Sequence, residues 1–201
     1  PLWSRGLGDV YKRQLKGLTG DEIAVLKTNG VDVIDANDQP ANPLVWSVDQ
    51  ANKLPPGVTF GSTNIVKISD TASALSGLTK DQIAALNTAG VDFFDATGAT
   101  ANNPITLTYE KAAALGHIVV DAGDTLTVTC STADLVSADI AALKASGVDI
   151  LLSSGAGHLL SLSVATYRAI IAAGIALTSA DTVTLSDTCL LYTSDAADDT
   201  P

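Results

Sequence analysis

Closely spaced aspartates are the residues whose type and spacing could do chemistry in this sequence. Four pairs recur near the ends of the expected strands: Asp32 and Asp35, Asp92 and Asp95, Asp121 and Asp124, and Asp181 and Asp187. Short carboxylate side chains can supply several of the oxygen ligands that Ca²⁺ requires, but the sequence has no EF-hand spacing and no Ca²⁺-binding glycine-rich nonapeptide. Aspartate also accepts hydrogen bonds from backbone N–H groups in turns and caps. We therefore expect a structural role, and we assign no metal site and no cofactor, with calcium as the alternative.

A cysteine and two histidines are the other side chains that could act as nucleophile, base or metal ligand. Cys130 has no histidine at the equivalent place in any copy of the repeat described below. His117 and His158 have no Cys or His neighbour at metal-ligand spacing. The stretch SSGAGHLL (153–160) lacks the third glycine and the lysine of phosphate-binding loops, so it predicts a turn. No Gly-x-Ser-x-Gly motif occurs, and we expect no catalytic residue and no enzyme activity.

The composition argues against two classes of partner. Of the 201 residues, 46% are apolar, so the chain can bury a core, and the formal net charge is -11. A strongly acidic chain repels phosphate groups, and we therefore expect no nucleic-acid partner. The sequence has no run of apolar residues long enough for a membrane-spanning helix, so none is expected.

The two ends of the chain differ in character from the rest. SRGLGDVYKRQ (4–14) is basic, whereas CLLYTSDAADD near the other end is acidic. One codon set for DVYKRQ has a reverse complement that encodes CLLYTS, and both stretches resemble translations of the adapter arms used in transposase-based sequencing libraries. We interpret residues 1–14 and 189–201 as adapter-derived and exclude them from fold reasoning; the alternative is a natural basic arm and acidic tail. Natural protein then spans 15–188 as an internal fragment, and Cys130 has no partner for an internal disulfide.

The remaining sequence repeats itself. The motif GVD begins at Gly30, Gly90 and Gly147, at intervals of 60 and 57 residues. An Ile followed three residues later by a Leu precedes each motif, which predicts an apolar helical face. The predicted helices lie within 15–32, 75–92 and 133–149. Their expected N-cap residues are Thr19, Thr79 and Ser137. The glycine of GVD suits the left-handed position that follows a helix.

A second type of element lies between these helices. It begins as a short strand that ends at a Ser or Thr, continues as a helix, and covers 44–54, 105–115 and 160–171. A glycine follows each of them, at Gly57, Gly116 and Gly174. The stretches after these glycines show the alternation of apolar and polar side chains that is typical of strands. They are 57–71, 116–132 and 174–188.

A unit of about 58 residues therefore occurs three times, and each unit divides into halves of about 29 residues that read strand, turn, short strand, helix. Short strands that alternate with helices favour parallel pairing through right-handed crossovers. Such units cannot bury their apolar faces alone. We predict that 15–188 forms an α/β repeat solenoid similar to leucine-rich repeats, with parallel strands on one side and helices on the other. The alternative is a row of independent ββαββα globules.

These elements resemble a known class of repeats. LTKDQIAALNTAGVDFFDAT (78–97), ITLTYEKAAALG (105–116) and DTVTLSDT (181–188) are similar to tandem repeats of very large bacterial secreted or cell-surface proteins of the repeats-in-toxin-like or adhesin-like kind. The resemblance implies an extracellular stalk or scaffold, often beside Ca²⁺-binding modules. This sequence departs from those modules themselves, so the resemblance carries over no metal ligand.

The function expected from these observations is structural. We predict a non-enzymatic stalk region of a large bacterial extracellular or cell-surface protein, whose partners are neighbouring repeats of the same chain. The alternative is an adhesion module, a solenoid that binds a cell-surface protein or glycan, with calcium as a stabilising ion. An aromatic stripe at equivalent strand positions would favour binding, but the aromatic residues occupy non-equivalent positions. They are Trp46, Phe60, Phe93, Phe94, Tyr109 and Tyr167.

Overall fold

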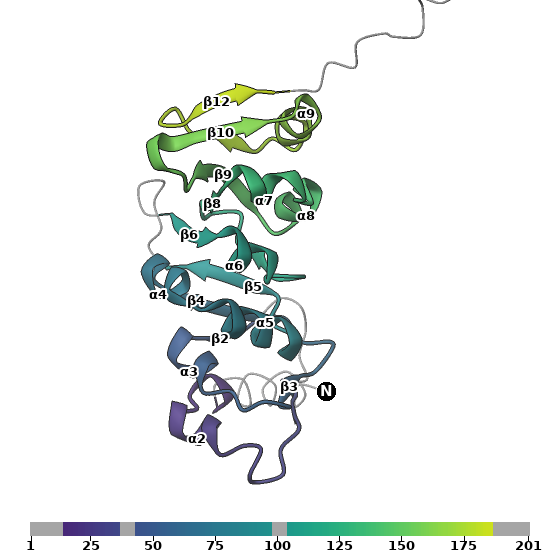
Figure 1. Cartoon of the computed structure of the whole chain (residues 1–201). Coiled ribbons are helices and arrows are strands. Elements are labelled where there is room, and N and C mark those ends of the chain that lie inside the picture. Colours follow the sequence, from purple (N-terminus) through teal and green to yellow (C-terminus); the bar gives the residue numbers. More distant parts are fainter. Residues whose placement is uncertain (1–13, 37–42, 98–103, 187–201) are drawn as a thin grey trace, which may run out of the picture.

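The computed structural model describes residues 14–36, 43–97 and 104–186. Apart from Gln14, the ends that we interpret as adapter-derived lie outside these ranges, so that interpretation stays a prediction. Asp187, from one of the aspartate pairs, also lies outside them. The elements follow one another in chain order along the long axis of the molecule, from α2 (Gly20–Ala24) at one end to β12 (Thr182–Leu185) at the other (Figure 1).

Short strands alternate with short helices between these two ends. The helices are α3 (Val48–Asn52), α4 (Ala72–Gly77), α5 (Lys80–Ala89), α6 (Tyr109–Ala113), α7 (Thr132–Val136), α8 (Ile140–Ala145) and α9 (Val164–Ala172), with a 3₁₀ turn η1 (Ala156–His158). The strands are β1 (Val33–Ile34), β2 (Leu44–Trp46), β3 (Thr59–Phe60), β4 (Val66–Asp70), β5 (Phe93–Ala96), β6 (Ile105–Thr108), β7 (Val119–Val120), β8 (Leu126–Cys130), β9 (Val148–Ser153), β10 (Leu159–Leu162) and β11 (Ala176–Leu177).

A glycine with positive φ precedes each pair of strands and divides the chain into six segments. Segments 1 to 6 are residues 30–56, 57–89, 90–115, 116–146, 147–173 and 174–186. Each contains a first and a second strand, and segments 1 to 5 continue into a helical part. In their described residues, segments 1, 3 and 5 have one α-helix each, whereas segments 2 and 4 have two. This order agrees with the predicted strand, turn, strand and helix.

The glycines of the GVD motifs adopt the left-handed conformation that we predicted for them. Gly90 ends α5 with φ 91°, and Gly147 has φ 92°. A Cβ atom on Gly147 would lie 3.0 Å from Val120 O, in the preceding segment. Glycine is therefore required there both by its backbone conformation and by the close approach of β7 in the preceding segment.

All pairings between the described strands are parallel, which confirms a mixed α/β fold with parallel strands. The pairings form two four-stranded sheets, β2-β4-β5-β7 and β6-β8-β9-β11, and two two-stranded sheets, β1-β3 and β10-β12. Within each four-stranded sheet, the second strand of an even segment pairs with the first strand of the next segment, β4 with β5 and β8 with β9. β5 and β9 have four and six residues, against two in the other first strands. We did not predict this division into several sheets.

The predicted caps are correct at two helices and wrong at the third. Thr19 and Thr79 each form a capping box, with Glu22 and Gln82 respectively. Ser137 follows α7 instead of starting a helix, and Asp139 caps α8 by accepting the N–H of Ala142 at 2.9 Å. The stretch before the third GVD therefore contains two helices, since both Ser131 and Asp139 can start one.

The core runs continuously through all segments. Alternate residues of β2, β4, β6, β8 and β10 are buried, as at Val66 and Ile68 of β4, whereas the residues of β12 are exposed or half-buried. Trp46 and Phe60 meet edge to face at 5.2 Å between ring centroids, across the boundary of segments 1 and 2. Because the buried side chains form one cluster across the segments, contacts between segments contribute to the hydrophobic stabilisation of the fold.

Candidate functional site

The recurring aspartates connect neighbouring segments. The carboxylate of Asp92 in segment 3 accepts the N–H of Val66 at 2.8 Å, and that of Asp149 in segment 5 accepts the N–H of Leu126 at 3.1 Å. Val66 and Leu126 are the buried first residues of β4 and β8. Each carboxylate therefore satisfies a strand donor that water cannot reach.

A second set of aspartates bonds the far ends of the first strands. Asp124 accepts the N–H of Ala96, the last residue of β5, at 2.6 Å. Asp181 accepts the N–H of Ser153, the last residue of β9, at 3.1 Å. Both aspartates belong to the segment that follows the strand. In each of the pairs β4–β5 and β8–β9, the carboxylates thus bond the start of the one strand and the end of the other.

Asn64 occupies the corresponding position in segment 2, two residues before the second strand. Its Nδ2 donates to Ile34 O at 3.1 Å, so the contact to the preceding segment persists with the opposite polarity. The Oδ1 atom of Asn64 is buried and has no hydrogen-bond partner in the described part of the chain. The amide therefore connects segments 1 and 2 less completely than a carboxylate connects the later ones.

These bonds confirm that aspartates accept backbone N–H groups, but sequence reasoning missed where the donors are. The four donors lie 23 to 28 residues before their aspartates, in the preceding segment. Turn and cap bonds span two to four residues, so a local interpretation could not reach them. The signal was the recurrence of Asp at two places, after the glycine of the GVD motif in odd segments and before the second strand in segments 4 and 6.

Lys67 is the centre of the one charged cluster that spans three segments in the described structure. Its Nζ lies 2.7 Å from Asp121 Oδ2 and 3.4 Å from Asp95 Oδ2. Lys67 belongs to segment 2, Asp95 to segment 3 and Asp121 to segment 4. Ser69 Oγ donates a further hydrogen bond to Asp95 at 3.2 Å. The structure thus brings together members of two of the predicted aspartate pairs.

Two carboxylates near Lys67, those of Asp121 and Asp124, have pKa values that shift in opposite directions. The hydrogen bond to Asp121 raises the pKa of the Lys67 ammonium. The same bond lowers the pKa of Asp121. Burial raises the pKa of Asp124, and the negative charges of Asp95 and Asp121 add to this effect. The arrangement acts as an ion-paired clamp between strands, since each carboxylate oxygen described here points to a cation or a backbone donor.

The described residues contain no group of three or more His, Cys, Asp or Glu side chains that could hold a metal ion. In segment 1, Asp32 forms an ion pair with Lys27. No observation here adds support to the calcium alternative.

Cys130 and the histidines occupy structural positions. The Cys130 thiol is buried, and burial, followed by the charges of Asp134 and Asp181, raises its pKa to about 12. It stays a protonated thiol at neutral pH and is a poor nucleophile. The backbone N–H of His117 donates to Asn87, and His158 Nδ1 lies 3.4 Å from Asp181 Oδ1 in the predicted turn between β9 and β10. No histidine is near Cys130 in these contacts.

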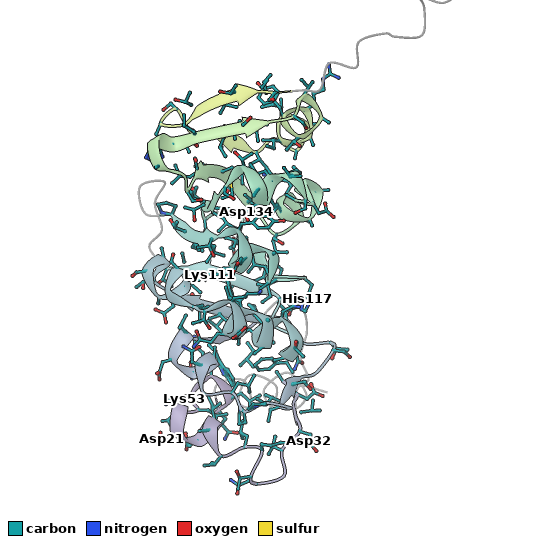
Figure 2. All side chains as sticks on the ribbon, viewed as in Figure 1. Asp21, Asp32, Lys53, Lys111, His117 and Asp134 are labelled. Carbon is teal, nitrogen blue, oxygen red and sulfur yellow. The ribbon has the colours of Figure 1, made fainter. Side chains whose placement is uncertain are left out.

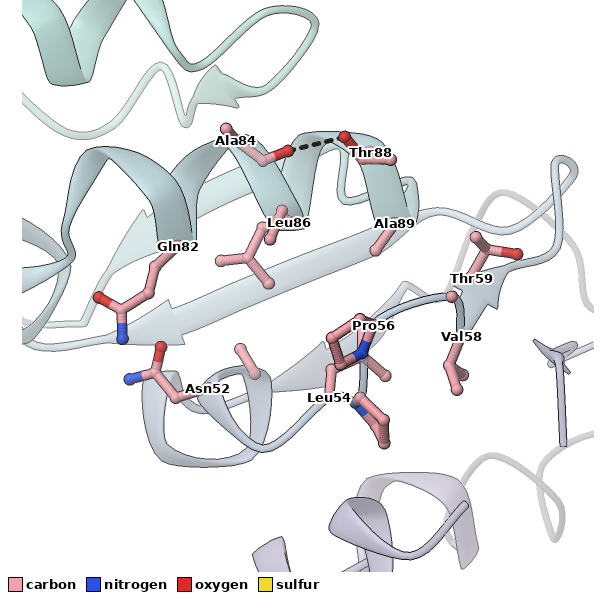
Figure 3. Close-up of a pocket in the computed structure, with 14 residues that line it drawn as sticks. Asn52, Leu54, Pro56, Val58, Thr59, Gln82, Ala84, Leu86, Thr88 and Ala89 are labelled. Atoms are coloured by element: carbon pink, nitrogen blue, oxygen red, sulfur yellow. Dashed lines mark hydrogen bonds between the residues drawn. The ribbon is translucent and has the colours of Figure 1, made fainter. Parts of the chain in front are cut away.

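A pocket of about 380 Å³ lies between α3 and α5 (Figure 3). Pro55 and Pro56 follow α3 and prevent it from continuing, because proline lacks the N–H donor of a helical turn. Facing them, α5 presents Leu86 and Ala89, and the short side chain of Ala89 leaves space unfilled. The pocket has the size and apolar lining typical of small-ligand sites.

The chemistry of this pocket is limited to binding. None of its 14 lining residues is titratable, and its side-chain polar groups are amides and hydroxyls. The Oε1 atom of Gln82 already accepts the N–H of Thr79 at 2.8 Å, and Thr88 Oγ1 donates to Ala84 O at 2.9 Å. The pocket could therefore hold an apolar group but offers no acid, base or nucleophile.

The surface shows neither an aromatic stripe nor a single charged patch. Trp46, Phe60 and Phe94 are buried, and the other aromatic side chains of the described residues are half-buried. The labelled charged side chains are spread along the molecule, with Asp32 at the segment 1 end and Asp134 far from it (Figure 2).

The helices of the described ranges are all too short or too polar to cross a bilayer. No protein-family model matches the chain, and neither a curated protein nor a solved structure matches it significantly.

Proposed function

We propose that this chain is a non-enzymatic structural repeat region, a stalk, from a large bacterial extracellular protein. Its six segments are coils of an α/β solenoid similar to leucine-rich repeats. The observation that supports this proposal best is the set of bonds from one segment to the next, which recur at the same two places along the molecule.

These bonds suit a stalk because each segment depends on its neighbours. The N–H of Val66 in segment 2 is satisfied only by Asp92 of segment 3 among the described residues. Lys67 contacts carboxylates of both following segments. In such an array, stability is approximately a sum of segment and nearest-neighbour terms, so length can grow without a new core design.

The extracellular setting follows from the resemblance of 78–97, 105–116 and 181–188 to secreted repeats, and the acidity of the chain is compatible with it. The partners are neighbouring repeats of the same chain. The recurring aspartates of segments 3 to 6 bond backbone groups, which is structural work, and we expect a hydrolase screen on this chain to find no turnover.

Truncation tests the coupling on which this proposal depends. A variant that ends at residue 146 lacks segments 5 and 6, so β8 loses its partner β9 and the N–H of Leu126 loses Asp149. We expect segments 3 and 4 to unfold at a lower urea concentration than in a control that lacks only 187–201. Independent ββαββα globules would leave their midpoint unchanged.

A second candidate function is an adhesion module that binds a cell-surface protein. The apolar pocket between α3 and α5 favours a protein side chain over a glycan, because it is lined by aliphatic groups and no aromatic ring. A panel of cell-surface proteins tested against the wild type and against Ala85→Trp, which would fill the pocket, distinguishes this candidate. Binding by the wild type that the substitution abolishes would support the adhesion module. If no protein of the panel binds, the stalk remains the proposed function.

A further inference from the structure

The pocket between α3 and α5 is built by a connection that differs from its counterparts in the repeat. The connection that follows α3 spans 53–58 and contains Pro55 and Pro56. The equivalent connections after α6 and α9 span 114–118 and 173–175 and contain no proline. Those segments stack without prolines, so stacking alone does not account for the pair at this boundary.

The two prolines begin a β-turn that forms one wall of the pocket. The N–H of Val58 donates to Pro55 O at 3.1 Å, and Gly57 has φ 79°. Proline at the second position and a glycine with positive φ at the third are the pattern of a type II turn. Because proline fixes its own φ and Val58 is buried in the core, this wall is rigid before any ligand arrives. A preformed site loses little conformational entropy on binding, which favours affinity.

The space between this turn and α5 is apolar. Leu86 and Ala89 of α5 face the prolines across it, and Leu54 lies next to the prolines (Figure 3). No aromatic side chain is among the described residues that line it, so a planar ring finds no partner for stacking. Its volume of about 380 Å³ is near the lower end of the range for small-ligand sites. The pocket therefore suits a small aliphatic group, whose burial is favourable.

Two side-chain amides lie opposite each other at one end of the pocket (Figure 3). Gln82 directs Oε1 to the N–H of Thr79, which fixes the orientation of its amide and leaves Nε2 without a partner among the described residues. The Asn52 amide likewise has no hydrogen-bond partner in the described ranges, so it offers both a donor and an acceptor. This end of the pocket can therefore bind a polar group that accepts one hydrogen bond and donates another.

The charge around the pocket selects against an ionised ligand. No charged side chain is among the described residues that line it. Lys27 contacts its rim, with Nζ 3.5 Å from Gly57 O, but the ammonium already pairs with Asp32. The net charge of -11 also disfavours an anion near this surface. A charged head group would lose water without gaining a counter-charge, which is costly, so the head group that fits is uncharged.

We propose that this pocket binds a small uncharged amphiphile, an aliphatic chain that carries a primary amide. The chain lies between the turn at Pro55 and Pro56 and the facing side of α5. The amide oxygen of the ligand accepts a hydrogen bond from Gln82 Nε2, and its N–H group donates to Asn52 Oδ1. Such a ligand site goes beyond the stalk role and does not depend on it.

Two-dimensional ¹⁵N NMR of the full chain tests this site with octanamide as the probe. Octanamide should cause saturable shifts of the amides in α3, 54–59 and α5, with a dissociation constant of about 1 mM or lower for a ligand of this size. Octanoate has the same chain with a charged head, and acetamide has the same head without the chain. Each should bind about tenfold more weakly or worse, since one part of the site stays unsatisfied.

A substitution that fills the pocket shows whether the shifts come from binding there. Ala85 is exposed on α5, three residues after Gln82 and four before Ala89, so it lies on the same helical face. Ala85→Trp places a ring in the pocket and should abolish the octanamide shifts. The matched control is Ala142→Trp, at the equivalent exposed position of α8, and it should bind as the wild type does. An equal loss in the control would overturn the site.

A second substitution tests the polar end without filling the pocket. Gln82→Glu keeps an oxygen that accepts the N–H of Thr79 but removes the Nε2 donor. Glu22 forms the same capping box in α2, so the helix should be retained and circular dichroism should be unchanged. Octanamide should bind about tenfold more weakly, because a donor is replaced by a carboxylate that repels the ligand oxygen.

Each outcome decides for or against the site. Saturable shifts that are lost in Ala85→Trp and weakened in Gln82→Glu support it, and Gln82→Glu alone carries the test if the tryptophan variant shows altered circular dichroism. No saturable shift in the wild type, or shifts that persist in Ala85→Trp, overturn the site. Octanoate that binds as tightly as octanamide, or wild-type affinity in Gln82→Glu, overturns the uncharged amide head. The truncation test of the stalk is independent of these results, so the two failures are distinguishable.

Discussion

Segments 1 and 3 carry the same GVD motif but differ in what surrounds it. In segment 3, Asp92 bonds the buried N–H of Val66, and β5 is enclosed between β4 and β7. In segment 1, Asp32 is an exposed member of an ion pair with Lys27, and β1 has one described partner strand. The same three residues thus form a connection in the interior and a surface at the end.

This difference shows that the contribution of a motif in this fold depends on its neighbours. The aspartate is energetically important where its donor is shielded from water, and it contributes little where both partners are solvated. Substitutions at enclosed positions and at exposed positions near segment 1 should therefore have unequal effects, and each pair below measures a different part of the inequality.

The largest difference is expected in apolar packing. Phe94→Ala should lower the free energy of unfolding by about 3–5 kcal/mol, because a fully buried ring leaves a cavity. Val33→Ala, at a side chain that is 53% exposed, should change it by less than about 0.5 kcal/mol. Urea denaturation followed by circular dichroism measures both. Similar losses would show that segment 1 is as enclosed as segment 3.

A smaller difference is expected for the aspartates. Asp92→Ala leaves the N–H of buried Val66 unsatisfied, which should cost about 1–3 kcal/mol. Asp32→Ala should cost less than about 1 kcal/mol, because it breaks only an exposed ion pair. Asp92→Asn is the matched control, since its amide oxygen can still accept and should restore part of the loss. An Asp92→Ala variant as stable as the wild type would contradict a stabilising role for the hydrogen bond between Asp92 and Val66.

The smallest difference in stability loss at neutral pH is expected between the ion pairs of Lys67 and Lys27. Lys67→Met breaks a cluster whose lysine side chain is 21% exposed, and it should cost about 1 kcal/mol with a moderate salt dependence. Lys27→Met should cost less than about 0.5 kcal/mol, because both partners of its ion pair are largely exposed. Unfolding in low and high salt measures both effects, and an equal loss in the two variants would contradict the clamp.

The stability contributions of Asp121 and Asp124 should depend on pH in opposite directions. The pKa of Asp121 is lowered in the folded state, so its stabilisation is present above 3.8 and is lost as pH falls through the lowered value. The pKa of Asp124 is raised, so its contribution is greatest below 3.8 and is lost as pH rises through the raised value.

Urea unfolding at about pH 6.5 and about pH 2.5 should show these opposite trends. The stability deficit of Asp121→Asn should shrink toward acid, and that of Asp124→Asn should grow. Parallel trends in the two variants would contradict the assigned contacts of Lys67 and Ala96.

Much of the local structure could be predicted because local chemistry determines it. Thr79 and Gln82 form the capping box that their spacing indicates, and Gly90 ends α5 as predicted. The predicted N-cap of α8 was wrong, because Ser137 and Asp139 are both residues that favour this position and the sequence does not rank them. The pairing of β4, a second strand, with β5, a first strand, was not predicted. The alternation of side chains indicates a strand but does not indicate which strand it pairs with.

The candidate site shows the same limit. That aspartates bond backbone groups followed from their chemistry, whereas the donors of Asp92 and Asp124 belong to another segment and depend on how the segments stack. The pocket was not predicted, because it results from two prolines and small side chains that come together only in the folded chain.

Hydrogen exchange of Phe94→Ala tests the central claim, that each segment is stabilised by both neighbours, most directly. The stacked segments predict faster amide exchange in β5 and also in β4 and β7, which belong to segments 2 and 4 and pair with β5. Independent globules made of paired segments predict faster exchange in segments 3 and 4 alone. Unchanged protection of β4 in this variant would therefore contradict the account.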